Sequence, residues 1–105
     1  MNIELLWFQG CPNHEQAEVM LRDALAVRGL NVPIQRIDVE DEETGNALVF
    51  PGSPTIRIDG RDVEPEWEPC EDCTPRCRLY MTSEGLRGVP AREWIERALD
   101  VALAD

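Results

Sequence analysis

Residues 3–39 constrain the fold most, because they follow the pattern of a strand, a helix and a second strand in close succession. Residues 3–8 are apolar except for Glu4, which is typical of a strand buried on both faces of a sheet. Apolar residues then recur at helical spacing over residues 12–28, and residues 34–39 predict the second strand. A unit of this length predicts two parallel strands joined by a right-handed crossover.

The middle of the chain carries elements that extend this unit into a mixed sheet. An acidic run over residues 38–43 leads into a short helical segment that ends near Phe50. Residues 55–58 alternate in polarity, and the Asp-Gly pair at 59–60 is a strong hairpin signal. We therefore expect residues 61–64 to return antiparallel.

The last third of the chain predicts a loop, a short strand and a helix. Residues 65–77 are rich in Pro, Glu, Asp and Cys, and they predict an irregular loop. Residues 79–81 predict a short extra strand, and Pro90 opens a final helix with one apolar stripe. Together the elements predict an α/β fold of order βαβ(α)ββα, with a central mixed four-stranded sheet flanked by helices. The chain length fits one domain over residues 1–105.

The charge balance excludes two classes of partner. The chain has 21 acidic and 10 basic residues, for a formal net charge of -11. Nucleic acids and anionic lipids select for clusters of Lys and Arg, so we expect no nucleic-acid partner and no membrane partner. The N-terminus lacks the basic region of a signal peptide, and no apolar run approaches the ~20 residues that span a bilayer. We expect a soluble, cytoplasmic protein.

Two short motifs about forty residues apart suggest a family. The first is Gly-Cys-Pro-Asn-His at residues 10–14, directly after the first strand, and the second is Gly-Ser-Pro-Thr at residues 52–55, directly before another. In this order of elements, the chain resembles the thioredoxin and glutaredoxin superfamily. The resemblance implies a thioredoxin-like fold, a cis peptide bond before Pro54, and Cys11 as a nucleophile facing Pro54 and the substrate. It does not supply the second cysteine of a C-x-x-C motif, because His14 stands there.

Cys11 and His14 are the candidate residues of the first motif. A cysteine at the start of a helix lies near unpaired backbone N–H groups and the positive end of the helix dipole, which favour the thiolate. We expect Cys11 to lie at an accessible edge. His14, one helical turn further, could orient or deprotonate Cys11 or join it as a metal ligand, or it could be an exposed histidine without a partner.

Cys70-x-x-Cys73-x-x-x-Cys77 is the more specific thiol signal, because three cysteines fall within eight residues of the predicted loop. They could form a disulfide, hold a metal through three thiolates, or supply a resolving partner for Cys11. The hairpin strand before the loop should end near Cys11, so the loop should lie at the same edge of the sheet. We favour Cys70 or Cys73 as the resolving thiol.

Three functions follow from these motifs. The first is thiol–disulfide exchange without a required cofactor, in which Cys11 attacks a disulfide and Cys70 or Cys73 resolves the mixed species. Its partner would be a thiol or disulfide substrate such as a protein. The second is binding of zinc or another soft metal by Cys70, Cys73 and Cys77, with Cys11 or His14 as the fourth ligand. The third is a non-catalytic adaptor that uses the Pro54 edge for protein contact.

Overall fold

The computed structural model describes residues 1–104, and it has an α/β architecture. In chain order the elements are β1 (Ile3–Trp7), α1 (His14–Val27), β2 (Ile34–Asp38), α2 (Glu42–Leu48), β3 (Thr55–Ile58), β4 (Arg61–Asp62), β5 (Tyr80–Thr82), β6 (Gly85–Arg87) and α3 (Arg92–Ala104). Strands β1 to β4 form a four-stranded sheet in the order β2-β1-β3-β4, and β5 pairs with β6 in a separate hairpin. The predicted mixed four-stranded sheet is confirmed.

Strand β1 lies inside the sheet and sets its mixed character. It pairs in parallel with β2, from Ile3 beside Ile34 to Trp7 beside Asp38, and antiparallel with β3 on its other side. The parallel pair confirms the strand–helix–strand unit predicted over residues 3–39. A parallel pair needs a long crossover connection, which α1 supplies.

The hairpin between β3 and β4 forms as its Asp-Gly signal predicts. Asp59 and Gly60 both have positive φ, 52° and 81°, as a two-residue turn of the I′ type requires. Strand β4 is shorter than predicted, because only Arg61 and Asp62 pair with β3.

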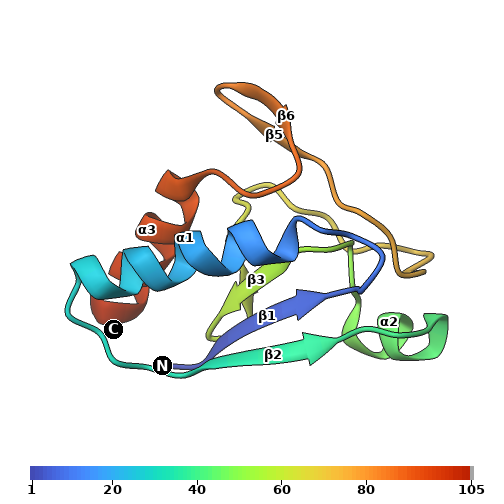
Figure 1. The fold of residues 1–105 in the computed structure, drawn as a ribbon, viewed down its shortest axis with the longest axis horizontal. Coiled ribbons are helices and arrows are strands. Elements are labelled where there is room, and N and C mark those ends of the chain that lie inside the picture. The colour runs from blue at the N-terminus through green and yellow to red at the C-terminus, as the bar shows by residue number, and fades with distance from the viewer. Residues whose placement is uncertain (105) are drawn as a thin grey trace.

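Both faces of β1 are buried. Leu5 packs in a core formed mainly with apolar residues of α1 and α3, including Leu21 and Leu99. Its neighbour Leu6 points to the opposite face and packs with Val39 and Phe50. Figure 1 shows α1 and α3 together on one side of the sheet, with α2 at the far end of β2. The run of apolar residues at 3–8 is therefore explained, as predicted, by a strand that is buried on both faces of the sheet.

Two helices begin two residues later than predicted. Helix α1 begins at His14, after Asn13 in the capping position, whereas Pro12 was predicted inside the helix. Helix α3 begins at Arg92, two residues after Pro90.

The β5–β6 hairpin projects from the body of the molecule (Figure 1). Its first strand lies one residue from the predicted short strand, and its second strand was not predicted. Three apolar side chains near or within it are mostly exposed: Leu79, Met81 and Leu86. A hairpin that does not bury one complete face lacks the clear alternation by which a strand is predicted.

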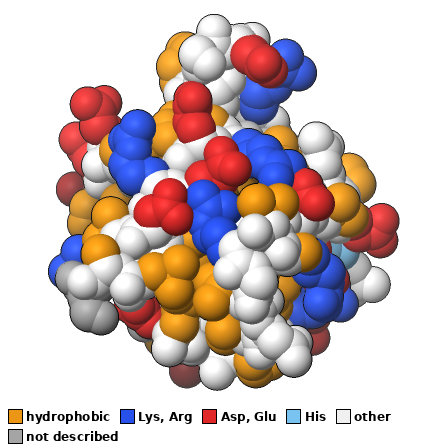
Figure 2. Space-filling model, turned by 90° about the vertical axis from the view of Figure 1, so that its left-hand side faces the viewer, with side chains coloured by type: hydrophobic (Ala, Val, Ile, Leu, Met, Phe, Trp, Pro, Cys, Tyr) orange, Lys and Arg blue, Asp and Glu red, His pale blue; other side chains and the backbone are white. Residues whose placement is uncertain are grey.

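Charged side chains of both signs are interspersed on the surface seen in Figure 2. All ten basic residues of the chain are arginines. Several join elements that are distant in sequence, such as Arg28, which donates from Nε to Asp100 at 2.8 Å. Within residues 1–104, no helix has the length and apolar character needed to cross a membrane.

Candidate thiol site

Residues 65–77, which carry Cys70, Cys73 and Cys77, form the cysteine loop. This loop is attached to the segment before β3 through the backbone of Ser53. The Ser53 N–H donates to the carbonyl of Arg76 at 2.7 Å, and the Arg78 N–H donates to the Ser53 carbonyl at 2.9 Å. Ser53 and Cys77 thereby form a parallel bridge. The Ser53–Pro54 peptide bond is cis, which confirms that prediction.

Gly52 allows this close approach of the two segments. Its φ is 137°, which side chains rarely adopt, and an added Cβ would lie only 2.8 Å from the Cβ of Arg78. The same added Cβ would lie 3.0 Å from the Cα of Arg78, which is backbone. The glycine of the second motif is therefore required by the docking of the cysteine loop as well as by the local turn.

Cys11 lies beside this junction, and it is fully buried. Its thiol donates a hydrogen bond to the Ser53 carbonyl at 3.4 Å, and its N–H donates to the carbonyl of Phe8 at 3.1 Å. The expectation of an accessible Cys11 is therefore wrong. The sequence around Cys11 gave no sign of this burial, because Ser53 meets it from 42 residues further along the chain.

Cys77 is a free, exposed cysteine, and it is bridged to Ser53, the residue whose carbonyl accepts from the Cys11 thiol. A hydrogen bond with Cys11, then partial burial and the Cys11 charge, raise the pKa of the Cys77 thiol above its ordinary value. Cys11 and Cys77 therefore meet at Ser53, whose carbonyl accepts from the Cys11 thiol and whose backbone is bridged to Cys77. The structure brings Cys77 to Cys11, whereas the sequence favoured Cys70 or Cys73 in that place.

Cys70 and Cys73 are bonded to each other in a disulfide, with their Cα atoms 5.6 Å apart. The sequence left this pairing open as one of three uses of the loop. Cys73 is buried, and its N–H donates to the side-chain oxygen of Asn46 at 3.2 Å. A Cβ at Gly45 would overlap the carbonyl oxygen of Cys73, so the loop packs directly on the backbone of α2.

Arg78 anchors the end of the cysteine loop from the inside of the molecule. Its side chain is 5% exposed, and it pairs with the fully buried side chain of Asp62 at 2.7 Å and with Glu64 at 3.3 Å. It also donates to the hydroxyl of Thr55 at 3.0 Å. Burial alone would lower the pKa of Arg78, but Tyr80 and the two carboxylates raise it above its ordinary value.

Tyr80 completes this anchor. Its ring lies 4.3 Å from the guanidinium carbon of Arg78, and its hydroxyl donates to the carbonyl of Pro54. Burial raises the pKa of the Tyr80 phenol well above its ordinary value, so the hydroxyl remains a donor at all physiological pH. In the sequence, only adjacency to Cys77 pointed to Arg78 and Tyr80.

His14 packs against Trp7, whereas Cys11 was its expected partner. Its ring lies 4.6 Å from that of Trp7, and among residues 1–104 its Nδ1 atom is buried without a hydrogen-bond partner. No hydrogen bond joins it to Cys11 in the described part of the chain. The expected roles of His14 in orienting or deprotonating Cys11 thus have no contact to support them.

The residues proposed as metal ligands are not assembled as a ligand set. Cys70 and Cys73 are bonded to each other, so neither offers a free thiolate. Over residues 1–104, the structure gathers no three His, Cys, Asp or Glu side chains in a group that could hold a metal ion. The donor set of Cys70, Cys73 and Cys77 with Cys11 or His14 therefore does not fit a metal in this arrangement.

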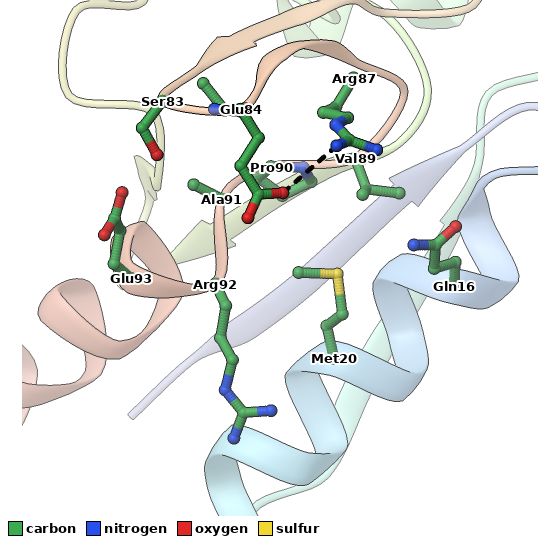
Figure 3. A pocket seen from close by; sticks show the side chains of 11 residues that line it. Gln16, Met20, Ser83, Glu84, Arg87, Val89, Pro90, Ala91, Arg92 and Glu93 are labelled. Atoms are coloured by element: carbon green, nitrogen blue, oxygen red, sulfur yellow. Dashed lines mark hydrogen bonds and ion pairs between the residues drawn. The ribbon is translucent and has the colours of Figure 1, made fainter.

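A cavity of about 300 Å³ lies between the β5–β6 hairpin, α1 and the start of α3. Figure 3 shows Met20 and Gln16 entering it from α1, opposite the ion pair of Glu84 and Arg87 on the hairpin. No cysteine lines this cavity. The thiols are therefore separate from it.

Comparison of the chain with protein-family models, with curated proteins and with solved structures gives no match.

Proposed function

We propose that the chain is a thioredoxin-like thiol–disulfide redox protein in which Cys11 and Cys77 form the redox pair. The observation that carries this proposal is that a buried cysteine, Cys11, and an exposed one, Cys77, both meet Ser53 at the cis peptide bond before Pro54. Two cysteines held at the same residue need little movement to form a disulfide. The pair also has a solvent-facing member that an external disulfide can reach.

The arrangement of elements supports the thioredoxin-like part of the proposal. The sheet order β2-β1-β3-β4 is compatible with that fold, and the Cys-Pro pair precedes the helix that follows β1. The cis-proline directly precedes β3, as the resemblance implies. The chain departs from the usual pattern in taking its second thiol from position 77 instead of position 14.

In this proposal Cys77 attacks and Cys11 resolves, which reverses the role expected for Cys11. An external disulfide cannot reach a fully buried sulfur without a rearrangement, but it can reach Cys77. Because the pKa of Cys77 is raised, less of this thiol is ionised at a given pH, by about tenfold for each pH unit by which the pKa rises. A thiolate of higher pKa is also more nucleophilic, and this offsets roughly 0.4–0.5 log units of rate for each such pH unit. This balance slows attack by Cys77, whereas attack by Cys11 first needs a rearrangement that exposes its sulfur.

The exchange conserves electrons in two steps. The Cys77 thiolate attacks one sulfur of the substrate disulfide, a bond forms between them, and the other substrate sulfur leaves as a thiolate. Cys11 then loses its proton and attacks the Cys77 sulfur, so that a Cys11–Cys77 disulfide forms and the substrate leaves fully reduced. Two electrons pass from the protein to the substrate, and an external dithiol restores the reduced pair.

Turnover of a small peptide disulfide, with a dithiol as electron donor, tests this proposal. Cys77→Ser should abolish turnover over background, and Cys11→Ala should accumulate protein covalently joined to the substrate through Cys77, as a mass increase. The double variant Cys70→Ser/Cys73→Ser is the matched control, and it should retain turnover. Equal rates for the wild type and Cys77→Ser would overturn the proposal.

A further inference from the structure

The Cys70–Cys73 disulfide and the Cys11–Cys77 pair lie along the same short segment of backbone. The Sγ atom of Cys70 is 3.4 Å from the carbonyl oxygen of Phe50, and that of Cys11 is 3.4 Å from the carbonyl oxygen of Ser53. Cys77 is bridged to the same Ser53. One cysteine of each pair thus lies against a carbonyl, and these two carbonyls are three residues apart.

The surroundings of the disulfide also suit its reduced form. A disulfide sulfur carries no proton, so the approach of Cys70 to Phe50 is a contact and not a hydrogen bond. After reduction the Cys70 thiol would donate to that carbonyl, and the Cys73 thiol would donate to the Cys70 carbonyl, 3.5 Å from its sulfur. Both released thiols therefore have acceptors already in place.

The disulfide contributes little to holding the chain together. It links residues three positions apart, and closure of so small a loop restricts the unfolded chain less than closure of a long loop does. The loop is already fixed by backbone hydrogen bonds to Ser53 and by the buried pair of Arg78 and Asp62. A cross-link that the fold does not need is free to change its redox state.

We propose that the Cys70–Cys73 disulfide is a second redox centre, which exchanges electrons with the Cys11–Cys77 pair through Cys77. The inference rests on the proposed function for the pairing of Cys11 with Cys77. Cys77 is four residues from Cys73 in the same loop, with no helix or strand between them. An attack within one loop has a far higher effective concentration than attack by an external thiol, and burial of Cys73 hinders the external route.

The electron transfer is an exchange of two disulfides. The Cys77 thiolate attacks the Cys73 sulfur, a Cys73–Cys77 bond forms, and Cys70 leaves as a thiolate that takes up a proton and donates to the Phe50 carbonyl. Cys11 loses its proton and attacks Cys77, which forms the Cys11–Cys77 disulfide and releases the Cys73 thiolate. Two electrons move from the first pair to the second, and no external oxidant is consumed.

Disulfide mapping tests this exchange, because trypsin cleaves after Arg76 and Arg78 and separates Cys77 from the other cysteines. Protein that holds only the Cys70–Cys73 disulfide is incubated without oxygen at about pH 8.5, where thiolate is available. Free thiols are then alkylated and the peptides are weighed. In the wild type we expect a Cys11–Cys77 link with Cys70 and Cys73 alkylated. In Cys11→Ala we expect a link between Cys77 and Cys73.

The control is Cys70→Ser/Cys73→Ser, which has no internal electron acceptor and should form no Cys11–Cys77 link under the same conditions. Absence of every Cys77 cross-link in both the wild type and Cys11→Ala would overturn the inference, provided that parallel samples show Cys77 fully alkylated in the same time. This readout uses no substrate. Cross-links without turnover of an external disulfide would refute the proposed function alone, and turnover without cross-links would refute the second centre alone.

Discussion

At the scale of single residues, the four cysteines differ mainly in how far solvent can reach their sulfur atoms. Cys11 and Cys73 are buried, whereas Cys77 is exposed and Cys70 is partly exposed. Each pair therefore combines one sulfur that solvent can reach with one that it reaches poorly. In the proposed exchange, the reachable sulfur of the Cys11–Cys77 pair attacks and the other resolves.

The reactivity of Cys77 should depend on pH through Cys11. Because the hydrogen bond and charge of Cys11 raise the pKa of Cys77, its alkylation by iodoacetamide should have a midpoint above that of an ordinary cysteine. Cys11→Ala removes both causes, so the midpoint should move to lower pH. The rate of Cys77 alkylation from pH 6 to 10 is measured by peptide mass. An unchanged midpoint in Cys11→Ala would show that the thiols do not interact.

Ser53 should tolerate loss of its hydroxyl. Within residues 1–104 the buried Oγ atom has no hydrogen-bond partner, so it carries a desolvation cost without a compensating bond. In urea denaturation, Ser53→Ala should leave the free energy of unfolding unchanged or raise it by up to about 1 kcal/mol.

The neighbouring hydroxyl of Thr55 is the matched control. It donates to the Gly52 carbonyl at 2.6 Å and accepts from Arg78 at 3.0 Å. Thr55→Val should therefore cost about 1–3 kcal/mol. Equal losses for the Ser53 and Thr55 variants would contradict the difference in bonding.

At the scale of elements, the cysteine loop is positioned by contacts with several parts of the fold. Helix α2 contacts Cys73, the segment before β3 pairs with Arg76 and Arg78, and β4 supplies the Asp62 carboxylate. Strand β5 adds the Tyr80 hydroxyl. The position of the loop is thus a property of the assembled sheet and helices, and it does not follow from the loop's own residues.

Gly45→Ala should disturb the loop, although alanine usually favours a helix by up to about 1 kcal/mol over glycine. The new methyl group would overlap the Cys73 carbonyl, which is backbone and cannot move alone. We expect a net loss of about 1–3 kcal/mol in the free energy of unfolding. Reduction of the Cys70–Cys73 disulfide by a dithiol should also become faster. Asn46→Ala is the control that removes the hydrogen bond to Cys73 without adding volume.

Arg78→Met should be strongly destabilising, by about 3–5 kcal/mol, because it leaves the buried Asp62 carboxylate without its cation. The double variant Arg78→Met/Asp62→Asn removes the uncompensated charge, and it should recover part of that loss. Thermal unfolding monitored by circular dichroism measures both. If the double variant is no more stable than the single one, the charge of Asp62 is not the cause.

At the scale of the whole molecule, self-repulsion accompanies the net charge of -11. The longest dimension is 36 Å, so at about 20 mM salt, where the Debye length is roughly 20 Å, much of this repulsion acts across the protein. Raising NaCl to about 0.3 M should increase Tm, because screening weakens the repulsion. KCl should have the same effect. A fall in Tm would mean that surface ion pairs such as Arg28 with Asp100 outweigh the repulsion.

Local patterns in the sequence determined most of the architecture. Periodicity predicted α1 and the central strands, and the Asp-Gly pair predicted the β3–β4 turn. The strand–helix–strand pattern predicted the parallel pairing of β1 and β2. These features depend on neighbouring residues and on the length of the connection, so they are visible in the order of residues.

Only the tertiary structure decided which sulfurs meet and which are buried. Cys11 is closed off by Ser53 from 42 residues away, and Cys77 reaches it because Arg76 and Arg78 pair with the same Ser53. The spacing of Cys70, Cys73 and Cys77 left open the disulfide, the metal site and the resolving partner. The choice among them follows from contacts between distant segments, since burial and proximity are properties of the packed molecule and not of any single stretch of the chain.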